Sequence, residues 1–451
     1  MRETVIVNQK EQRRIRVLVE VVGGRMTVGQ AAESMNLSVR QTQRILAAFR
    51  KEGAAGVAHG NRGRQPVHSI DEERRAHVEM LARTTYRNCN DSHLCELLAE
   101  REGVVLSRSS VRRIRRDAGL ASPRTRHQPA HRVRRERRTT AGQLVQIDGS
   151  QHHWFGADQP RAVLMAGIDD ATSDVVSAHF RETEDSQGYL QLLHDLVSTH
   201  GCPVALYHDK HQIFVSPDPE SVDDQLAGRS PLTQVGRAIA ELGIEPITAH
   251  SPQAKGRIER LFGTFQDRLL TELDLAGVTT IPDANRFLQT FLPRYNQRFM
   301  RAATMPGSAY EPIPETVDLA SICCFKYWRT VANDNTVRFQ HQHLQLLPGA
   351  TRISYARARV QVHQHLDGSL AVFAADELVA SQPAPIEPPV LRAKSGRVTE
   401  PSSFMGEPPP DAERDELAAW NTTPPTVTPS RSTPARNHPW RQGFKRKVTQ
   451  S

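Results

Sequence analysis

The sequence lacks the features that mark several common protein classes. It has only five cysteines, an odd number with no Cys-x-x-Cys pair, which excludes a disulfide framework and a zinc ribbon. No run approaches the roughly 20 apolar residues that span a bilayer. The first residues, MRETVIVNQKEQRR, contain no apolar stretch of the kind found in secretory signals. We therefore expect a protein of a reducing compartment, the cytoplasm, with no membrane segment.

Charge is unevenly distributed along the 451 residues, whose formal net charge is +8. Residues 1–141 hold 29 Lys and Arg against 15 Asp and Glu, whereas residues 142–319 hold 13 against 24, and residues 320–451 hold 16 against 11. A basic first third predicts a polyanionic partner, most simply nucleic acid. The acidic middle is typical of a metal-dependent catalytic domain.

The first 60 residues predict a helix-turn-helix unit. A helix over 9–22 is followed by a second that Thr27 caps, by the turn Asn36-Leu37-Ser38, and by a third helix that Ser38 caps. The third helix is expected to turn one set of side chains inward, namely Val39, Ile45, Leu46 and Phe49. A second set is expected to face outward and meet DNA, namely Arg40, Gln41, Gln43 and Arg44. The alternative is a small helical hairpin with an ordinary solvated face.

A second basic helical unit is predicted beyond it, with helices over 71–84 and 91–102 and another that Ser107 opens. Its inward stripe is Val111, Ile114 and Ala118, and its arginines are expected to contact phosphates: Arg108, Arg112, Arg113, Arg115 and Arg116. Residues 123–141 hold seven arginines and one acid, and Arg134 and Arg135 are among them. This linker is expected to be disordered when free and to track a phosphate backbone.

From Gln143 the pattern changes to a mixed α/β sheet. Three strand-like runs, QLVQIDGS, RAVLMAGIDD and DVVSAHFRET, precede alternating helices and strands that end in a helix over 281–299. Within the second run, Asp169 and Asp170 are interpreted as hairpin-turn residues. Short strands over 320–380 predict a small β-barrel or sandwich. From Ser381 the chain holds 13 of the 29 prolines and is expected to be a disordered tail.

The fold expected is therefore multidomain, and the parts can be assigned by residue number. These are two N-terminal all-α helix-turn-helix units (1–60 and 61–122), a basic linker (123–141), a central α/β core (142–300), a small C-terminal β-barrel (301–380) and a disordered Pro-rich tail (381–451).

Three acidic residues are the strongest catalytic candidates. Asp148 is expected at the end of the first strand, Asp209 follows the fourth, and Glu259 lies in a long helix predicted from Pro252. An open sheet edge is where α/β sites usually form, and three converging carboxylates need a compensating cation. Mg²⁺ or Mn²⁺ would suit these oxygen ligands. Taken singly, each acid is better explained as a turn-former, a helix cap or a solvated charge, but the three acids taken together with their flanking sequences are not.

The motifs around these acids resemble those of a known family. The ordered set QIDGS, HDKHQIF and SPQAKGRIERLFGTFQDRL resembles bacterial insertion-sequence transposases with a retroviral-integrase-like, RNase H-type catalytic core. The Pro-Gln-x-x-Gly-x-x-Glu-Arg element, which starts at Pro252 and includes Glu259 and Arg260, is its most specific part. The similarity in layout covers about residues 9–380.

The resemblance implies that Asp148, Asp209 and Glu259 hold two divalent ions, Mg²⁺ or Mn²⁺. It implies that Lys255, four residues before Glu259, approaches DNA, with Arg260 beside it. It further implies cleavage at the inverted repeats of an element, joining of the 3′-OH ends to target DNA, and at least two protomers on the double-stranded DNA. The 49 residues between Asp209 and Glu259 exceed the typical integrase spacing, and the excess coincides with residues 215–228.

Two other readings remain open. A non-catalytic regulator descended from a transposase would keep the helix-turn-helix arms without selection on the acids. A phage or retroelement integrase would share the chemistry, but retroviral integrases carry a zinc module whose spacing is not found in this sequence.

Overall fold

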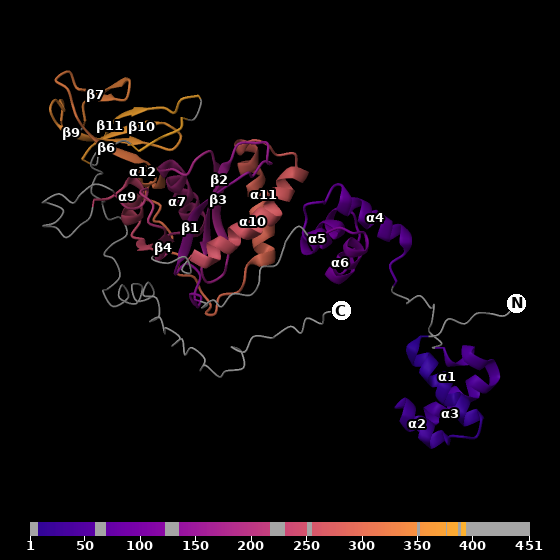
Figure 1. The fold of residues 1–451 in the computed structure, drawn as a ribbon. Coiled ribbons are helices and arrows are strands. Elements are labelled where there is room, and N and C mark those ends of the chain that lie inside the picture. The colour runs from indigo at the N-terminus through magenta and orange to yellow at the C-terminus, as the bar shows by residue number, and fades with distance from the viewer. Residues whose placement is uncertain are drawn as a thin grey trace, which may run out of the picture. The chain divides into compact units, whose positions relative to one another are not determined.

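The computed structural model describes residues 8–58, 69–121, 135–216, 231–249, 255–349, 352–375, 377–386 and 389–393 (Figure 1). The chain divides into two compact units, Met1–Met80 and Leu81–Ser451. Most of the linker and of the Pro-rich tail lies outside the described residues, so the expected disorder there stays a prediction.

The N-terminal unit begins with three capped helices. They are α1 (Gln9–Val22), α2 (Val28–Met35) and α3 (Val39–Glu52), and a short 3₁₀ turn at Gly53–Val57 follows. Thr27 and Ser38 each accept a hydrogen bond from a backbone N–H three residues on, as expected of N-caps. Asn36 ends α2 with φ at 54°, a left-handed conformation that asparagine tolerates. The predicted helix-turn-helix geometry is confirmed.

One inward residue of α3 was wrongly predicted. Leu46 and Thr42 are buried, but Val39 is 49% exposed. The buried residues Thr42 and Leu46 are four positions apart. The position one turn before Thr42 on the same face is the N-cap Ser38, so Val39 lies outside the buried stripe.

The second unit begins with helices that pack on the α/β core, and one of them, α6, is strongly basic. Helix α4 (Glu72–Arg83) crosses the boundary between units, and α5 (Asp91–Arg101) and α6 (Arg108–Asp117) follow. Glu96 of α5 forms ion pairs with Arg268 and Arg298, which belong to two helices of the core. Glu272 accepts hydrogen bonds from His93 at 3.2 Å and from Arg101 at 3.1 Å. The basic helical unit is thus joined to the core through carboxylates.

The core contains a five-stranded mixed sheet in the order β3-β2-β1-β4-β5. Its strands are β1 (Val145–His152), β2 (Ala162–Asp169), β3 (Val175–Arg181), β4 (Ala205–His208) and β5 (Glu245–Thr248). The first three are antiparallel, and β4 and β5 add to β1 in parallel. The central mixed α/β sheet expected from the sequence is confirmed.

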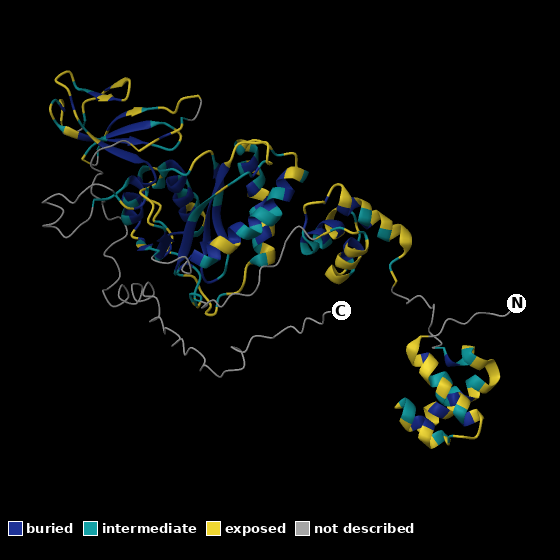
Figure 2. Cartoon of the chain, viewed as in Figure 1, coloured by how far each residue is buried: buried dark blue, intermediate teal, exposed yellow. Residues whose placement is uncertain are grey.

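Helices cover both faces of this sheet, and each face has its own apolar core (Figure 2). Helices α7 (Ser186–His200) and α9 (Gln234–Glu241) lie on one face, and α10 (Gly256–Leu275) and α11 (Ile281–Phe299) on the other. The α10 stripe of Ile258, Leu261, Phe262 and Phe265 is buried, as its spacing predicted. Burial of this stripe fixes the rotation of α10 about its axis.

The C-terminal β region is not a closed barrel in the described residues. Its strands form an open sheet in the order β11-β10-β9-β6 and a separate hairpin, β7-β8. Their bounds are β6 (Phe325–Thr330), β7 (Thr336–Phe339), β8 (Gln342–Gln345), β9 (Arg359–Gln364), β10 (Leu370–Ala374) and β11 (Glu377–Gln382), after a short helix α12 (Leu319–Ile322). The run TVRFQHQHLQLLP contains both strands of this hairpin, and the chain turns back at Gln340, whose φ is 57°.

The tail boundary at Ser381 also needs correction. Strand β11 continues to Gln382, and Leu391 is buried in the core that includes α7. The Leu391 amide donates to the Gln187 side chain at 2.9 Å, so the described part of this segment returns to the α/β core.

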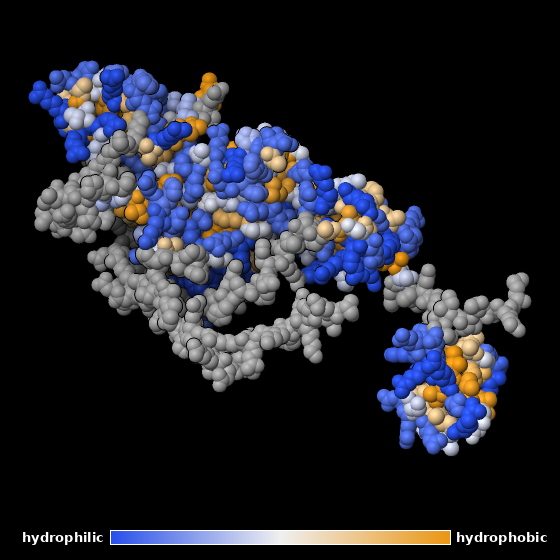
Figure 3. Space-filling view, viewed as in Figure 1, coloured by the Kyte–Doolittle hydropathy of each residue, from blue (hydrophilic) through white to orange (hydrophobic). Residues whose placement is uncertain are grey.

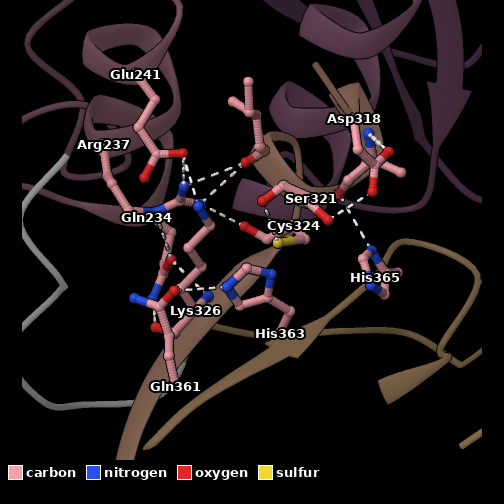
Figure 4. A network of polar contacts seen from close by, with 12 residues as sticks. Gln234, Arg237, Glu241, Asp318, Ser321, Cys324, Lys326, Gln361, His363 and His365 are labelled. Atoms are coloured by element: carbon pink, nitrogen blue, oxygen red, sulfur yellow. Dashed lines mark hydrogen bonds and ion pairs between the residues drawn. The ribbon is translucent and has the colours of Figure 1, made fainter. Parts of the chain in front are cut away.

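Buried charges join this β region to the core, as Figure 4 shows. Arg237 and Lys326 both bind one carboxylate oxygen of Glu241, at 2.9 and 2.8 Å. Arg237 also donates to the backbone carbonyls of Ile322 and Cys324, and Gln234 pairs with the backbone of Lys326. Burial, reinforced by Lys326 and Arg237, lowers the pKa of the neighbouring His363 to about 2, so this ring adds no further positive charge.

The surface in Figure 3 is mainly hydrophilic, with apolar side chains in small areas. None of the helices in the described ranges is both long and apolar enough to cross a membrane.

The packing of α10 yields a stability prediction. Leu269 is 0% exposed, so Leu269→Ala should cost about 2–5 kcal/mol through reduced burial and a residual cavity. The matched control is Leu347→Ala, because Leu347 is 65% exposed and the same change there should stay within about 0.5 kcal/mol. Chemical denaturation monitored by circular dichroism measures both; equal losses would contradict the assigned core.

Candidate functional site

Strand register brings Asp148 and Asp209 to the same level. Strands β1 and β4 are parallel neighbours, with Gln146 opposite Tyr207, and each aspartate lies two residues beyond that pair. Neighbouring strands are about 4.8 Å apart, so the two carboxylates are close. Asp209 follows β4, as expected, whereas Asp148 lies inside β1 rather than at its end, because pairing with β2 extends β1 to His152.

One ammonium lies between the two carboxylates. Lys255 Nζ is 2.8 Å from Asp148 Oδ1 and 3.9 Å from Asp209 Oδ2. Lys255 is the residue before α10 and is buried, so it does not share an exposed helix face with Glu259. The DNA contact that the resemblance implies for Lys255 therefore requires the lysine to leave these carboxylates.

Burial and charge act in opposite directions on Asp148. Burial raises the pKa of its carboxyl above the ordinary value, Lys255 opposes that rise, and the nearby Asp209 adds to it. The ionised form thus depends on a cation, since desolvation and a like charge both disfavour it.

The Asp209 carboxylate is oriented by its own loop. The His211 backbone N–H donates to Asp209 Oδ1 at 3.0 Å. The ring of His208 stacks on Phe214 with centroids 4.4 Å apart, and burial lowers the pKa of His208. A neutral, stacked ring supports a structural role for His208.

Glu259 lies in the first turn of α10, one turn beyond Lys255, and is exposed. In the part of the chain that the structure describes, no group of three or more His, Cys, Asp or Glu side chains is close enough to hold a metal ion. The structure therefore brings two of the three predicted acids together and leaves the third on the adjacent helix turn.

Sequence reasoning missed a further acid beside this site. Glu184 precedes α7, and its Oε1 accepts a hydrogen bond of 2.6 Å from the Tyr189 hydroxyl. A Cβ on Gly149 would lie 2.8 Å from the Glu184 carboxylate, so glycine next to Asp148 permits this close approach. Burial raises the pKa of Tyr189, and Glu184, Asp148 and Asp209 raise it further. Only the acidic run ETED after the third strand could have signalled this residue.

Most residues predicted to contact DNA are solvent-exposed. The exposed ones are Arg40, Gln41, Arg44, Arg108, Arg112, Arg113, Arg116 and Arg260. Arg115 is a correction: it is buried, and it donates to the backbone carbonyls of Cys89 and Ala121. Arg115 lies beside Ile114 on the buried side of α6. Its guanidinium there connects the segment before α5 with the segment after α6. Arg134 lies outside the described residues, and Arg135 pairs with the buried Asp170.

Comparison with known proteins places this geometry in context. A family model described as winged helix-turn-helix matches residues 14–76. The chain is 35% identical over 373 residues to the Sinorhizobium fredii protein named "Putative transposase y4bF", covering 82% of this chain and 79% of that protein. It is 30% identical over 406 residues to the transposase for insertion sequence IS1202 of Streptococcus pneumoniae, covering 82% and 85%.

Solved structures show weaker likenesses. A simian T-cell lymphotropic virus intasome in complex with PP2A regulatory subunit B56 gamma is 14% identical, with a TM-score of 0.28 over 68% of this chain and 99% of that chain. The HTLV-2 integrase catalytic core domain in complex with magnesium is 16% identical, with a TM-score of 0.25 over 36% and 92%.

The two transposases each match four fifths of the sequence, and the matches span most of their own length. This chain therefore belongs to the family of bacterial insertion-sequence transposases, whose general activity is DNA transposition.

Proposed function

We propose that this protein recognises the terminal inverted repeats of its own insertion element, cleaves a phosphodiester bond at each end, and joins the released 3′-OH to target DNA. The observation that carries the proposal is the pair Asp148 and Asp209. The two residues are level on parallel strands, and both carboxylates pair with the Lys255 ammonium. A regulator that only binds DNA has no need of two acids paired in this way.

The donor set fits divalent metal ions. Asp148 and Asp209 are hard oxygen ligands that already share one positive charge, and Glu259 supplies a third carboxylate from the next turn of α10. When bound, Mg²⁺ or Mn²⁺ at such a site lowers the pKa of an attacking water and stabilises charge on the leaving oxygen, with two ions acting as a clamp.

The protein's own groups would orient the reacting parts. Asp148 and Asp209 would hold the first ion, and Glu259 would complete the second site. In the first step water would attack the phosphorus, the bond from phosphorus to the 3′ oxygen would break, and that oxygen would leave as the 3′-OH. In the second step the 3′-OH would attack a phosphorus of the target strand, and the 3′ oxygen of the target strand would leave as a hydroxyl. No Ser or Tyr nucleophile is assigned.

Lys255 would change partners during this cycle. Its single ammonium forms ion pairs with both aspartates, at 2.8 Å from Asp148 and 3.9 Å from Asp209. A bound metal ion would supply the positive charge that the two aspartates require, and Lys255 could then move to a nearby DNA phosphate. The observed ion pairs and the DNA contact that the resemblance implies are therefore compatible.

The remaining parts would divide DNA recognition. Helix α3 would read the element ends through Arg40, Gln41 and Arg44, and the exposed arginines of α6 would hold phosphates. The domains would follow the sequence boundaries, with residues 1–122 for recognition, 123–141 as the linker and 142–300 for chemistry. Two protomers would pair the two ends.

Incubation of purified protein with the end-labelled DNA that flanks its gene, plus Mn²⁺, tests the proposal. Metal-dependent nicks at a discrete repeat boundary would support a transposase of this mechanism and identify the ends. Tight, specific binding without cleavage in Mg²⁺ or Mn²⁺ would favour the regulator.

The first prediction concerns Glu259. Glu259→Gln keeps the size of the side chain and removes its charge, so cleavage and joining should fall below detection while end binding changes by less than about twofold. The matched control is Glu315→Gln, because Glu315 is exposed and lies in the second compact unit. This variant should retain wild-type rates. Residual cleavage by Glu259→Gln within about tenfold of wild type would remove Glu259 from the site.

The second prediction concerns Lys255. Lys255→Gln leaves Asp148 and Asp209 without a cation and should lower the Tm in EDTA, by about 2–4 °C for each kcal/mol of destabilisation. Mg²⁺ should then raise the Tm of Lys255→Gln more than that of the wild type, because the ion displaces no ammonium. Lys51→Gln, at an exposed position of α3, is the control. An equal rise of the Tm with Mg²⁺ in the three proteins would contradict the replacement of the Lys255 ammonium by a metal ion.

The third prediction concerns α3. Replacing Arg40 and Arg44 together by alanine should weaken end binding and lower the slope of log K against log salt by about one for each phosphate that the variant no longer neutralises. Arg50→Ala, at the opposite end of the same helix, is the control. Fluorescence anisotropy over a salt series measures both, and an unchanged preference for end DNA in the double variant would exclude α3 as the reading helix.

A further inference from the structure

A buried carboxylate links the linker to the catalytic helix. Asp170 lies in the turn between β2 and β3, as the sequence predicts, and it is 0% exposed. Its backbone N–H donates to the Leu144 carbonyl at 2.9 Å, which fixes the residue beside the start of β1. Burying an ionised carboxylate is costly unless it is paired and hydrogen-bonded, so its partners matter.

Four donors converge on this carboxylate. Oδ1 accepts from Arg135, from Gln146 Nε2 at 2.8 Å and from Arg257 Nη1 at 2.7 Å, and Oδ2 accepts from the Arg138 backbone N–H at 2.9 Å. Two arginines therefore share one acid. One of them belongs to the linker and the other to the first turn of α10.

The network continues to the catalytic acids. Gln146 Oε1 accepts from the Ile258 backbone N–H at 3.3 Å, so the same side chain contacts Asp170 and α10. Asp148 is two residues beyond Gln146 on the same face of β1, and Glu259 directly follows Ile258. Arg257 Nη2 also donates to the Arg135 carbonyl at 3.3 Å, which closes the loop.

We infer that Asp170 is a positioning residue that aligns the first turn of α10, and with it Glu259, against β1, and that Arg135 ties this alignment to the DNA-binding linker. The inference rests on the proposed function. A displacement of about 1 Å in a catalytic group can cost about 100-fold in rate, so a network that sets the start of α10 can control the reaction without touching DNA.

The linker side of the network gives the coupling its direction. Residues 135–138 lie near the C-terminal end of the basic segment 123–141. If this segment binds DNA, a change in its conformation would be transmitted to Arg135. Arg135 and Arg257 both bind Asp170 Oδ1. A displacement of the Arg135 guanidinium therefore changes the strength of the ion pair between Arg257 and Asp170.

The decisive variant is Arg135→Gln in the full-length protein, since Asp170 keeps Arg257 and Gln146 as partners and the fold should survive. Asp170→Asn is the companion variant, and Asp158→Asn, at an exposed loop position of the core, is the matched control. Each protein is assayed for the Kd of end DNA, for the cleavage rate at saturating DNA with Mn²⁺, and for hydrogen exchange of the Ile258 amide.

We expect Arg135→Gln to leave the Kd within about twofold and to slow cleavage at saturating DNA by about 10- to 100-fold, the usual effect of removing an outer support of a metal site. The Ile258 amide should exchange faster than in the wild type. Arg135→Lys should restore part of the rate, and Asp158→Asn should behave as the wild type.

A weaker Kd with an unchanged rate at saturating DNA would make Arg135 an ordinary phosphate contact and overturn the inference. Unchanged exchange at Ile258 in Arg135→Gln would overturn it too, whether or not Asp170→Asn folds. If the wild type cleaves no DNA in either metal, the proposed function fails, but the exchange of Ile258 with and without end DNA still decides whether the network couples linker and helix.

Discussion

Two carboxylates at the same level on adjacent parallel strands repel each other unless a positive charge lies between them. The pairing of β1 with β4 creates this situation at Asp148 and Asp209, and Lys255 resolves it with its ammonium. The start of α10 must therefore lie over the sheet at this point. Its apolar stripe and its hydrogen bond to Gln146 hold it there, so sheet register, helix position and site charge depend on one another.

The same principle recurs at the joints between parts of the chain. Asp170 joins linker, β1 and α10, Glu241 joins α9 to the C-terminal β region, and Glu272 joins α5 to α10. Each is a buried carboxylate with at least two basic partners, of which at least one comes from a distant segment. Buried ion pairs add little net stability compared with apolar packing, but breaking one is costly, so they favour one alignment over others.

Buried acids also explain a contrast within the arginines. The net positive charge of residues 1–141 predicts DNA binding, and most arginines of α3 and α6 are exposed as that requires. Arg115 and Arg135, however, bind protein groups. Composition alone cannot separate the two uses, because a guanidinium is a good partner for a phosphate and for a buried carboxylate or carbonyl.

The sequence by itself determined the features that local interactions control. The ends of α1 to α3, the left-handed Asn36, the burial stripe of α10 and the order of strands and helices in the core follow from caps, periodicity and turn residues within a few positions. The motifs around the three acids likewise identified the family. The tertiary structure alone decided that Asp148 lies within β1, that Val39 is exposed, that the C-terminal sheet is open, and that the turn residue Asp170 is buried with partners from the linker, β1 and α10. Each of these depends on which distant strand or side chain is adjacent, and one-dimensional patterns carry no such information, since pairing partners are chosen by packing of the whole core.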